Sequence, residues 1–97
     1  METINSPLII EKEKISALIF PKDEVLTDKA EIIERTQVLN KAPILGNTEQ
    51  RKIKIIFKDN KDVLQVETTV WATTENNIIL KGGVNIPINR ILKVNIF

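Results

Sequence analysis

The hydrophobic pattern of the chain changes its period at Arg51, and this change limits the possible folds more than any other feature. Before Arg51, apolar residues recur every three or four positions, which is typical of a helix with one buried face. After it, apolar and polar residues alternate, which is typical of strands with one buried face. Nearly all the strands are therefore expected in residues 51–97 and a helix over residues 27–41, and the predicted fold class is α+β.

The C-terminal half predicts five short strands joined by tight polar turns. No crossover helix separates the strands, so they must pair antiparallel and form a small curled sheet or barrel. The second strand is long, and we expect it to bend. The strands lie at about residues 51–58, 63–74, 78–81, 84–89 and 92–96. The apolar positions predicted to form the core are Ile53, Ile55, Phe57, Val66, Val70, Leu80, Ile86, Ile91 and Val94.

The N-terminal half predicts one clear helix over Thr27–Lys41, with Thr27 or Asp28 as its cap. Asn40 and Pro43 mark its expected end, and Arg35 is expected to face water. Residues 8–20 fit either a helix or a strand, and we favour a helix. The chain, 97 residues long, is expected to form a single domain over 1–97, with a helical part over 1–46 and a β part over 47–97.

The chain contains no cysteine and no histidine. Disulfides, thiolate or imidazole metal sites, and Ser-His-Asp or Cys-His catalysis are therefore excluded. Neither a secretory signal nor a membrane-length apolar run is recognisable, so the expected location is cytoplasmic. The net charge is +1, made up of −3 over residues 1–50 and +4 over residues 51–97. This basic excess is too small to identify a nucleic-acid-binding protein.

The segment from Trp71 to Val94 contains a turn, a glycine pair and the run Ile-Pro-Ile-x-x-Ile-x-x-Val. It resembles the closing part of SH3-like and Sm-like small bacterial barrels, in which a one-turn 3₁₀ helix precedes the last strand. The resemblance places that turn at Pro87–Arg90 and covers roughly residues 51–96. The chain is also similar to small uncharacterised proteins of Bacteroidetes-type bacteria. The resemblance implies no catalytic residues.

Two groups of side chains are candidates for binding. Lys52, Lys54 and Lys58 share one face of the first strand and are suited to phosphate contacts, or they form a solvated face that prevents aggregation. Trp71 lies on a mostly polar face, where it either anchors a partner or is covered within the fold. In Sm-like barrels RNA bases bind near the loops, and the residues of this chain near such loops are Asn85, Asn89 and Arg90.

These observations favour a non-enzymatic binding module whose partner is another protein or a second copy of the chain. The alternative is a small RNA-binding barrel that uses the basic strand 51–58. No enzyme activity, cofactor, metal or membrane partner is expected. Self-assembly into a homo-oligomer is predicted because the chain is small and its last residues, Ile96 and Phe97, are apolar.

Overall fold

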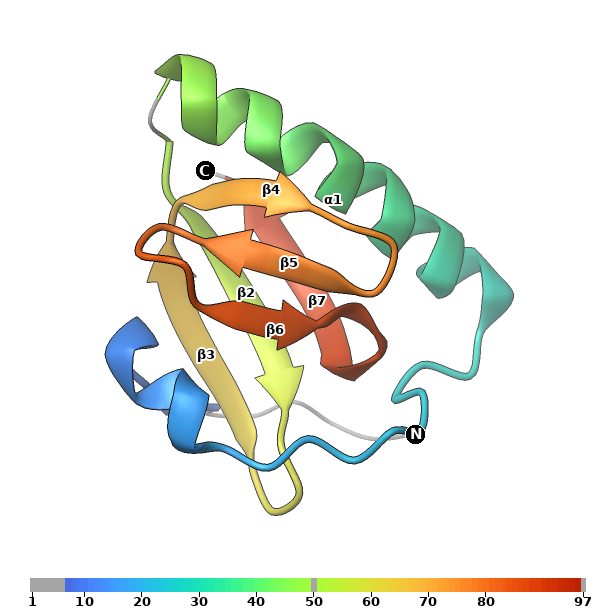
Figure 1. Cartoon of the computed structure of the whole chain (residues 1–97). Helices are drawn as coiled ribbons and strands as arrows, with labels where there is room; N and C mark the ends of the chain where they lie inside the picture. The colour runs from blue at the N-terminus through green and yellow to red at the C-terminus, as the bar shows by residue number, and fades with distance from the viewer. Residues whose placement is uncertain (1–6, 50, 97) are drawn as a thin grey trace.

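The computed structural model describes residues 7–49 and 51–96 and places one long helix against two β-sheets (Figure 1). The larger sheet has four strands in the order β1-β3-β2-β7, and the smaller has three in the order β4-β5-β6. The α+β class is therefore confirmed. With η denoting a 3₁₀ helix, the elements are β1 (Leu8–Ile9), η1 (Lys12–Ala17), α1 (Lys29–Glu49), β2 (Ile53–Lys58), β3 (Val63–Thr68), β4 (Val70–Thr73), β5 (Asn77–Leu80), β6 (Asn85–Pro87), η2 (Ile88–Arg90) and β7 (Ile91–Ile96).

The strands differ from the expected set in number and in arrangement. Over residues 7–49 and 51–96, seven strands replace the expected five, because the long second strand divides into β3 and β4 and because β1 is added. Within the described residues the strands form two sheets, and no pairing closes them into a barrel. β1 also pairs with β3 in parallel rather than antiparallel. This is possible because the long connection between them, which includes α1 and β2, lets the chain return in the same direction.

The expected bend in the long alternating segment lies at Thr69, between β3 and β4. The backbone carbonyl of Thr69 accepts a hydrogen bond from the amide of Lys81 at 2.9 Å, so the bend is held by the smaller sheet. β3 pairs with β2 in the larger sheet, whereas β4 pairs with β5 in the smaller one. The segment that contains β3 and β4 thus passes from one sheet to the other, and the core lies between the two sheets.

Helix α1 continues through Asn40 and Pro43 to Glu49, so the predicted end at Lys41 is wrong. Proline lacks the amide that would bond to the carbonyl four residues earlier, which here belongs to Leu39. The hydroxyl of Thr73 on β4 donates to that Leu39 oxygen at 2.6 Å. Because a tertiary contact satisfies the carbonyl that the proline leaves without a partner, the helix continues.

Small side chains allow α1 to approach β4 closely. Ala42 is 1% exposed, and a Cβ added to Gly46 would overlap the carbonyl oxygen of Val70 and lie 2.9 Å from Cγ2 of Thr69. The side chain of Asn47 also donates to the carbonyl of Trp71 at 3.1 Å. The helix therefore covers an edge of the smaller sheet that would otherwise be open.

Residues 8–20 do not form the α-helix that we favoured. β1 pairs with β3, and the amide of Ile10 continues the contact to the carbonyl of Gln65 at 2.9 Å. This pairing keeps the chain extended up to Ile10, and the short 3₁₀ helix η1 follows, with Ile15 buried. Phe20 then packs against Phe57, with ring centroids 6.1 Å apart. Too few residues lie between these anchors for a long α-helix.

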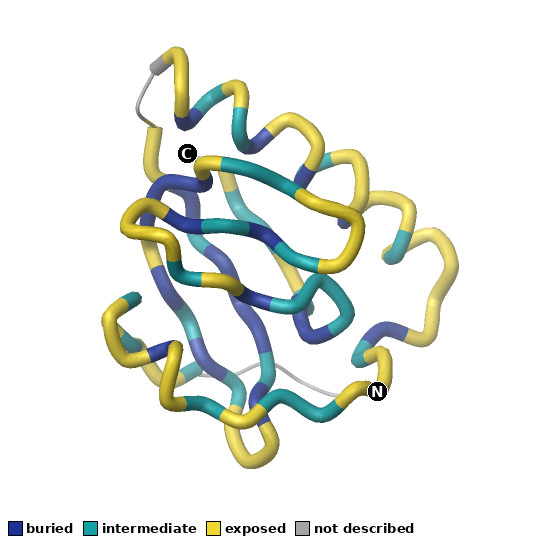
Figure 2. Tube along the Cα trace, viewed as in Figure 1, coloured by how far each residue is buried: buried dark blue, intermediate teal, exposed yellow. Residues whose placement is uncertain are grey.

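The core lies between the two sheets and under α1 (Figure 2). Eight of the nine predicted core residues are at most 2% exposed, and the ninth, Val94, is only half-buried. Helix α1 adds Leu39 and Ala42 to this cluster, and η1 adds Ile15. The one-turn helix η2 precedes β7 at the position that the resemblance implied.

Candidate functional site

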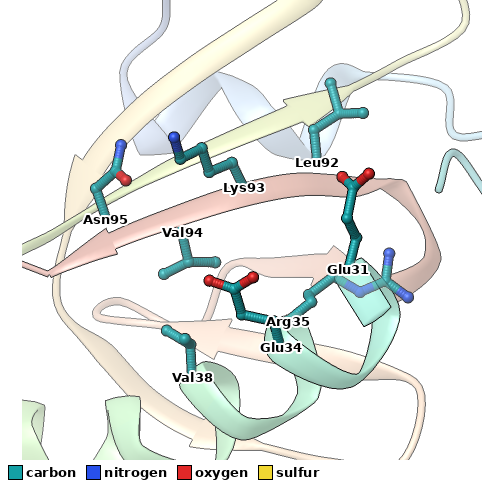
Figure 3. Close-up of a pocket in the computed structure, with 8 residues that line it drawn as sticks. All are labelled: Glu31, Glu34, Arg35, Val38, Leu92, Lys93, Val94 and Asn95. Atoms are coloured by element: carbon teal, nitrogen blue, oxygen red, sulfur yellow. The ribbon is translucent and has the colours of Figure 1, made fainter. Parts of the chain in front are cut away.

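A groove of about 360 Å³ separates α1 from β7, and we regard it as the candidate functional site (Figure 3). One wall comes from the helix and the other from the last strand. Its lining residues are Glu31, Glu34, Arg35 and Val38 of α1 and Leu92, Lys93, Val94 and Asn95 of β7. The volume is at the lower end of the range found for ligand sites, about 300–1,000 Å³.

The helix wall follows directly from helical spacing. Glu31, Glu34 and Val38 stand three and four residues apart, so they project from the same face of α1. Figure 3 shows these side chains directed toward β7, with Val94 pointing back toward them. Val94 pairs with Ile55, which is fully buried, so Val94 lies on the core side of its sheet. The groove therefore combines an apolar contact with two carboxylates.

The strand wall is the outer edge of the four-stranded sheet. β7 pairs with β2 on one side, and among the described residues no strand pairs with it on the other. Its register with β2 shifts, because Phe57 pairs with Ile91 whereas Ile56 pairs with Lys93, which leaves Leu92 as an extra residue. Such an edge offers backbone amides and carbonyls that can pair with an added strand.

Arg35 closes the groove where β7 begins. It is only 7% exposed, although the helical pattern predicted that it faces water, and its burial corrects that prediction. One terminal nitrogen, Nη1, donates to the Ile91 carbonyl at 3.0 Å and to the Glu24 carboxylate at 2.8 Å, and Nη2 also donates to Glu24. Its Nε is buried without an acceptor among the described residues. The charge of Arg35 is thus neutralised inside the fold.

Glu24 is the acidic partner of this arginine. Partial burial acts to raise the pKa of Glu24, but hydrogen bonds from Arg35 and from the Leu26 amide, with the attraction of the Arg35 charge, lower it further than burial raises it. The net result is a pKa below the ordinary value of 4.5. Glu24 is therefore ionised at neutral pH, and the pair ties the segment before α1 to the beginning of β7.

Of the three predicted lysines, Lys54 and Lys58 lie on the outer face of the larger sheet. Lys52 precedes β2 and is exposed. Lys54 and Lys58 flank Ile56 on β2, and Ile56 pairs with Lys93 on β7. The three lysines Lys54, Lys58 and Lys93 therefore share one face of the sheet. The last of them was not recognised from the sequence, because neighbouring strands are not visible in residue spacing.

The remaining predicted site residues do not join the lysines. Trp71 lies on the smaller sheet, where the β4–β5 register shifts between Val70 and Ala72, and it is 45% exposed. Asn85 is exposed on β6. The structure therefore separates the predicted residues into three places: the lysines at the larger sheet, Trp71 and Asn85 on the smaller sheet, and Asn89 and Arg90 on η2.

Asn89 and Arg90 serve the fold itself. The side-chain amide of Asn89 donates through Nδ2 to the carbonyls of Lys22 and Asp23 at 2.6 and 3.3 Å. Arg90, 4% exposed, donates to the carbonyls of Lys58, Asp59 and Asp23 and to the Asp23 carboxylate. Together they hold the segment before α1 and the β2–β3 turn against η2.

Among the described residues, no group of three or more carboxylate side chains converges in a way that could hold a metal ion, and no helix is both long and apolar enough to cross a membrane. Comparison of the chain with protein-family models, with curated proteins and with solved structures finds no match.

Proposed function

We propose that the chain is a non-enzymatic binding module that takes up an extended segment of a partner protein in the groove between α1 and β7. The observation that carries this proposal is the outer edge of β7, which has no strand partner among the described residues and faces a groove lined by α1. An extended peptide that joins such an edge gains main-chain hydrogen bonds, and side-chain pockets select its sequence.

The groove suits this mode of binding in its length and chemistry. Four consecutive residues of β7, Leu92–Asn95, form the strand wall. Val38 and Val94 provide apolar contacts for a side chain that enters between helix and strand, and Glu31 and Glu34 provide polar ones. Next to this stretch, the Ile91 carbonyl already accepts a hydrogen bond from Arg35. Added pairing would therefore begin just after Ile91.

A second copy of the chain is the less favoured occupant of this edge. Lys93 lies in the middle of the strand wall and is exposed. Lysines in edge strands hinder pairing between identical edges, because like charges opposite each other are destabilising. The predicted homo-oligomer therefore needs another surface, for which the exposed Trp71 and Ile96 are candidates, at 45% and 37% exposure. Phe97 lies outside the described residues.

The expected likeness to SH3-like and Sm-like barrels is part of this proposal. The bend between β3 and β4 and the one-turn helix η2 before β7 support it. In the proposed module, α1 lies between the edge strands β4 and β7 and provides the helix wall of the binding groove.

The test is selection of random decapeptides against the immobilised full chain, followed by titration of the isotope-labelled protein with a selected peptide. We expect the amide signals of Leu92–Asn95 to shift and their hydrogen exchange to slow. Strand addition uses alternate peptide amides. N-methylation at one set of alternate positions should therefore abolish binding, while N-methylation at the other set serves as the matched control. Equal effects of both sets, or shifts confined to other elements, would refute strand addition.

RNA binding on the outer face of the larger sheet is a second candidate function, favoured by the position of Lys93 between Lys54 and Lys58. Phosphate contacts make affinity fall steeply with salt. Polyuridine titrated at several salt concentrations tests this, and Lys93→Gln should reduce the slope of log affinity against log salt by about 1 if that lysine contacts a phosphate. If polyuridine does not bind, or binds with an affinity that does not depend on salt, RNA binding is removed as a candidate function.

A further inference from the structure

We infer that the segment bound in the α1–β7 groove carries alternating charge, with basic side chains toward α1 and acidic side chains toward the outer face of the sheet. This inference rests on the proposed strand addition. In an added strand, successive side chains point to opposite faces. The side chain opposite Val94 must share the core side with it, and the side chains opposite Lys93 and Asn95 must share the outer face.

The side facing α1 is acidic. Glu31 and Glu34 are exposed and project from the helix into the groove. Among the described residues that line the groove, Arg35 is the one cation on the helix, and it is bonded to Glu24 through two nitrogens, so it does not offset these carboxylates. A lysine or arginine of the bound segment would meet two carboxylates here, and its aliphatic stem would lie along Val38 and Val94.

The outer face beside the groove is basic. Figure 3 shows Lys93 projecting away from α1, on the opposite side from Val94. Lys54 and Lys58 lie on the same face of the neighbouring strand. Glu67 of β3 stands opposite Lys54 of β2 and reduces the positive charge there. Lys93 lies on the edge strand β7 itself, so its charge is next to the open edge. An acidic side chain opposite Lys93 would be attracted, whereas a basic one would be repelled.

The two faces therefore select opposite charges at alternating positions of the ligand. A segment with one sign of charge throughout is attracted on one face and repelled on the other. The partner chemistry that satisfies both is a short extended stretch in which lysine or arginine alternates with aspartate or glutamate.

The experiment compares synthetic peptides with the full chain by fluorescence anisotropy at low and physiological salt. The first peptide alternates lysine and glutamate, and a second has the same composition in two blocks of like charge. Two further peptides alternate threonine with lysine or with glutamate, and a neutral peptide alternates threonine with glutamine. We expect the alternating lysine–glutamate peptide to bind at least about fivefold more tightly than the block peptide, because several exposed pairs each contribute up to about fivefold.

Charge variants identify the two faces separately. Glu31→Gln and Glu34→Gln should each weaken the lysine–threonine peptide by about two- to fivefold and leave the glutamate–threonine peptide unchanged. Lys93→Gln should weaken binding of the glutamate–threonine peptide and leave that of the lysine–threonine peptide unchanged. Glu13→Gln is the matched control, since this carboxylate is 69% exposed on η1 and does not line the groove.

The outcomes separate this inference from the proposed function. If all peptides bind equally and the amide signals of β7 shift, strand addition stands and the charge inference is overturned. The charge inference also fails if only peptides from the random selection bind and these lack alternating charge. If neither the designed nor the selected peptides bind at β7, both fail. If polyuridine binds while peptides do not, the basic outer face is a nucleic-acid surface instead.

Discussion

Replacing Gly46 with alanine is expected to change stability in opposite directions in an isolated helix and in the folded chain. In an exposed helix interior, glycine is about 0.8–1.0 kcal/mol less favourable than alanine, so Gly46→Ala would stabilise an isolated α1. In the structure, however, the new Cβ overlaps the carbonyl oxygen of Val70 and approaches Cγ2 of Thr69 to 2.9 Å. The Val70 oxygen belongs to the backbone of a fully buried residue paired with Leu80, so it cannot rotate away.

The helix must therefore move off β4 to accommodate the methyl group. Overpacking of this kind costs about 1–3 kcal/mol, and the displacement also weakens the contact of Ala42 with the core and the bond from Thr73 to Leu39. After the gain in helix propensity is subtracted, overpacking alone leaves a net loss of up to about 2 kcal/mol in the free energy of unfolding, and the weakened contacts add to this loss. A domain of this size loses about 4–8 °C in Tm for each kcal/mol.

The assay is urea unfolding followed by circular dichroism and by the fluorescence of Trp71, which lies on β4 beside the helix. Asn40→Ala is the matched control, because Asn40 is an exposed position of the same helix and gains propensity without a clash. We expect the control to gain a few tenths of a kcal/mol. If Gly46→Ala stabilises the chain as much as propensity predicts, α1 does not pack on β4 at this position.

The remaining predictions concern two polar contacts. Thr73→Val should cost about 1–3 kcal/mol, because it leaves the Leu39 carbonyl without a donor, but clearly less in a Pro43→Ala background, where the restored amide bonds to that carbonyl; equal costs in the two backgrounds would contradict this explanation of the continuous helix. Because the pKa of Glu24 is lowered in the folded state, its pair with Arg35 contributes stability above pH 4.5, the ordinary value, and loses it as pH falls through the folded pKa. The stability difference between the chain and Glu24→Gln, measured by urea unfolding from pH 7 to pH 3, should therefore shrink below about pH 4.5, and a constant difference would show that the pair does not form.

The candidate site was not predictable as a unit. Helical spacing places Glu31, Glu34 and Val38 on one face, and this could be read from the sequence. That this face lies opposite β7, about 60 residues later in the chain, could not. The expected exposure of Arg35 was wrong for the same reason, because charged side chains are assigned to the surface unless a distant partner is known. The burial of Arg90 was likewise not visible in the sequence, and its binding role stays a prediction. Here the partners are backbone carbonyls at Ile91 and Lys58 and the carboxylate of Glu24.

The sequence by itself determined the features that depend on neighbouring residues. Alternation and turn residues placed the strands of the C-terminal half, and eight of nine core residues followed from the same alternation. That the segment over residues 63–74 bends followed from its length, whereas the position of the bend at Thr69 did not. Only the tertiary structure decided the division into two sheets, the parallel pairing of β1 and the length of α1. Each of these depends on a contact between residues far apart in the chain, such as Thr73 with Leu39, and the periodicity of a single segment contains no information about its distant partner.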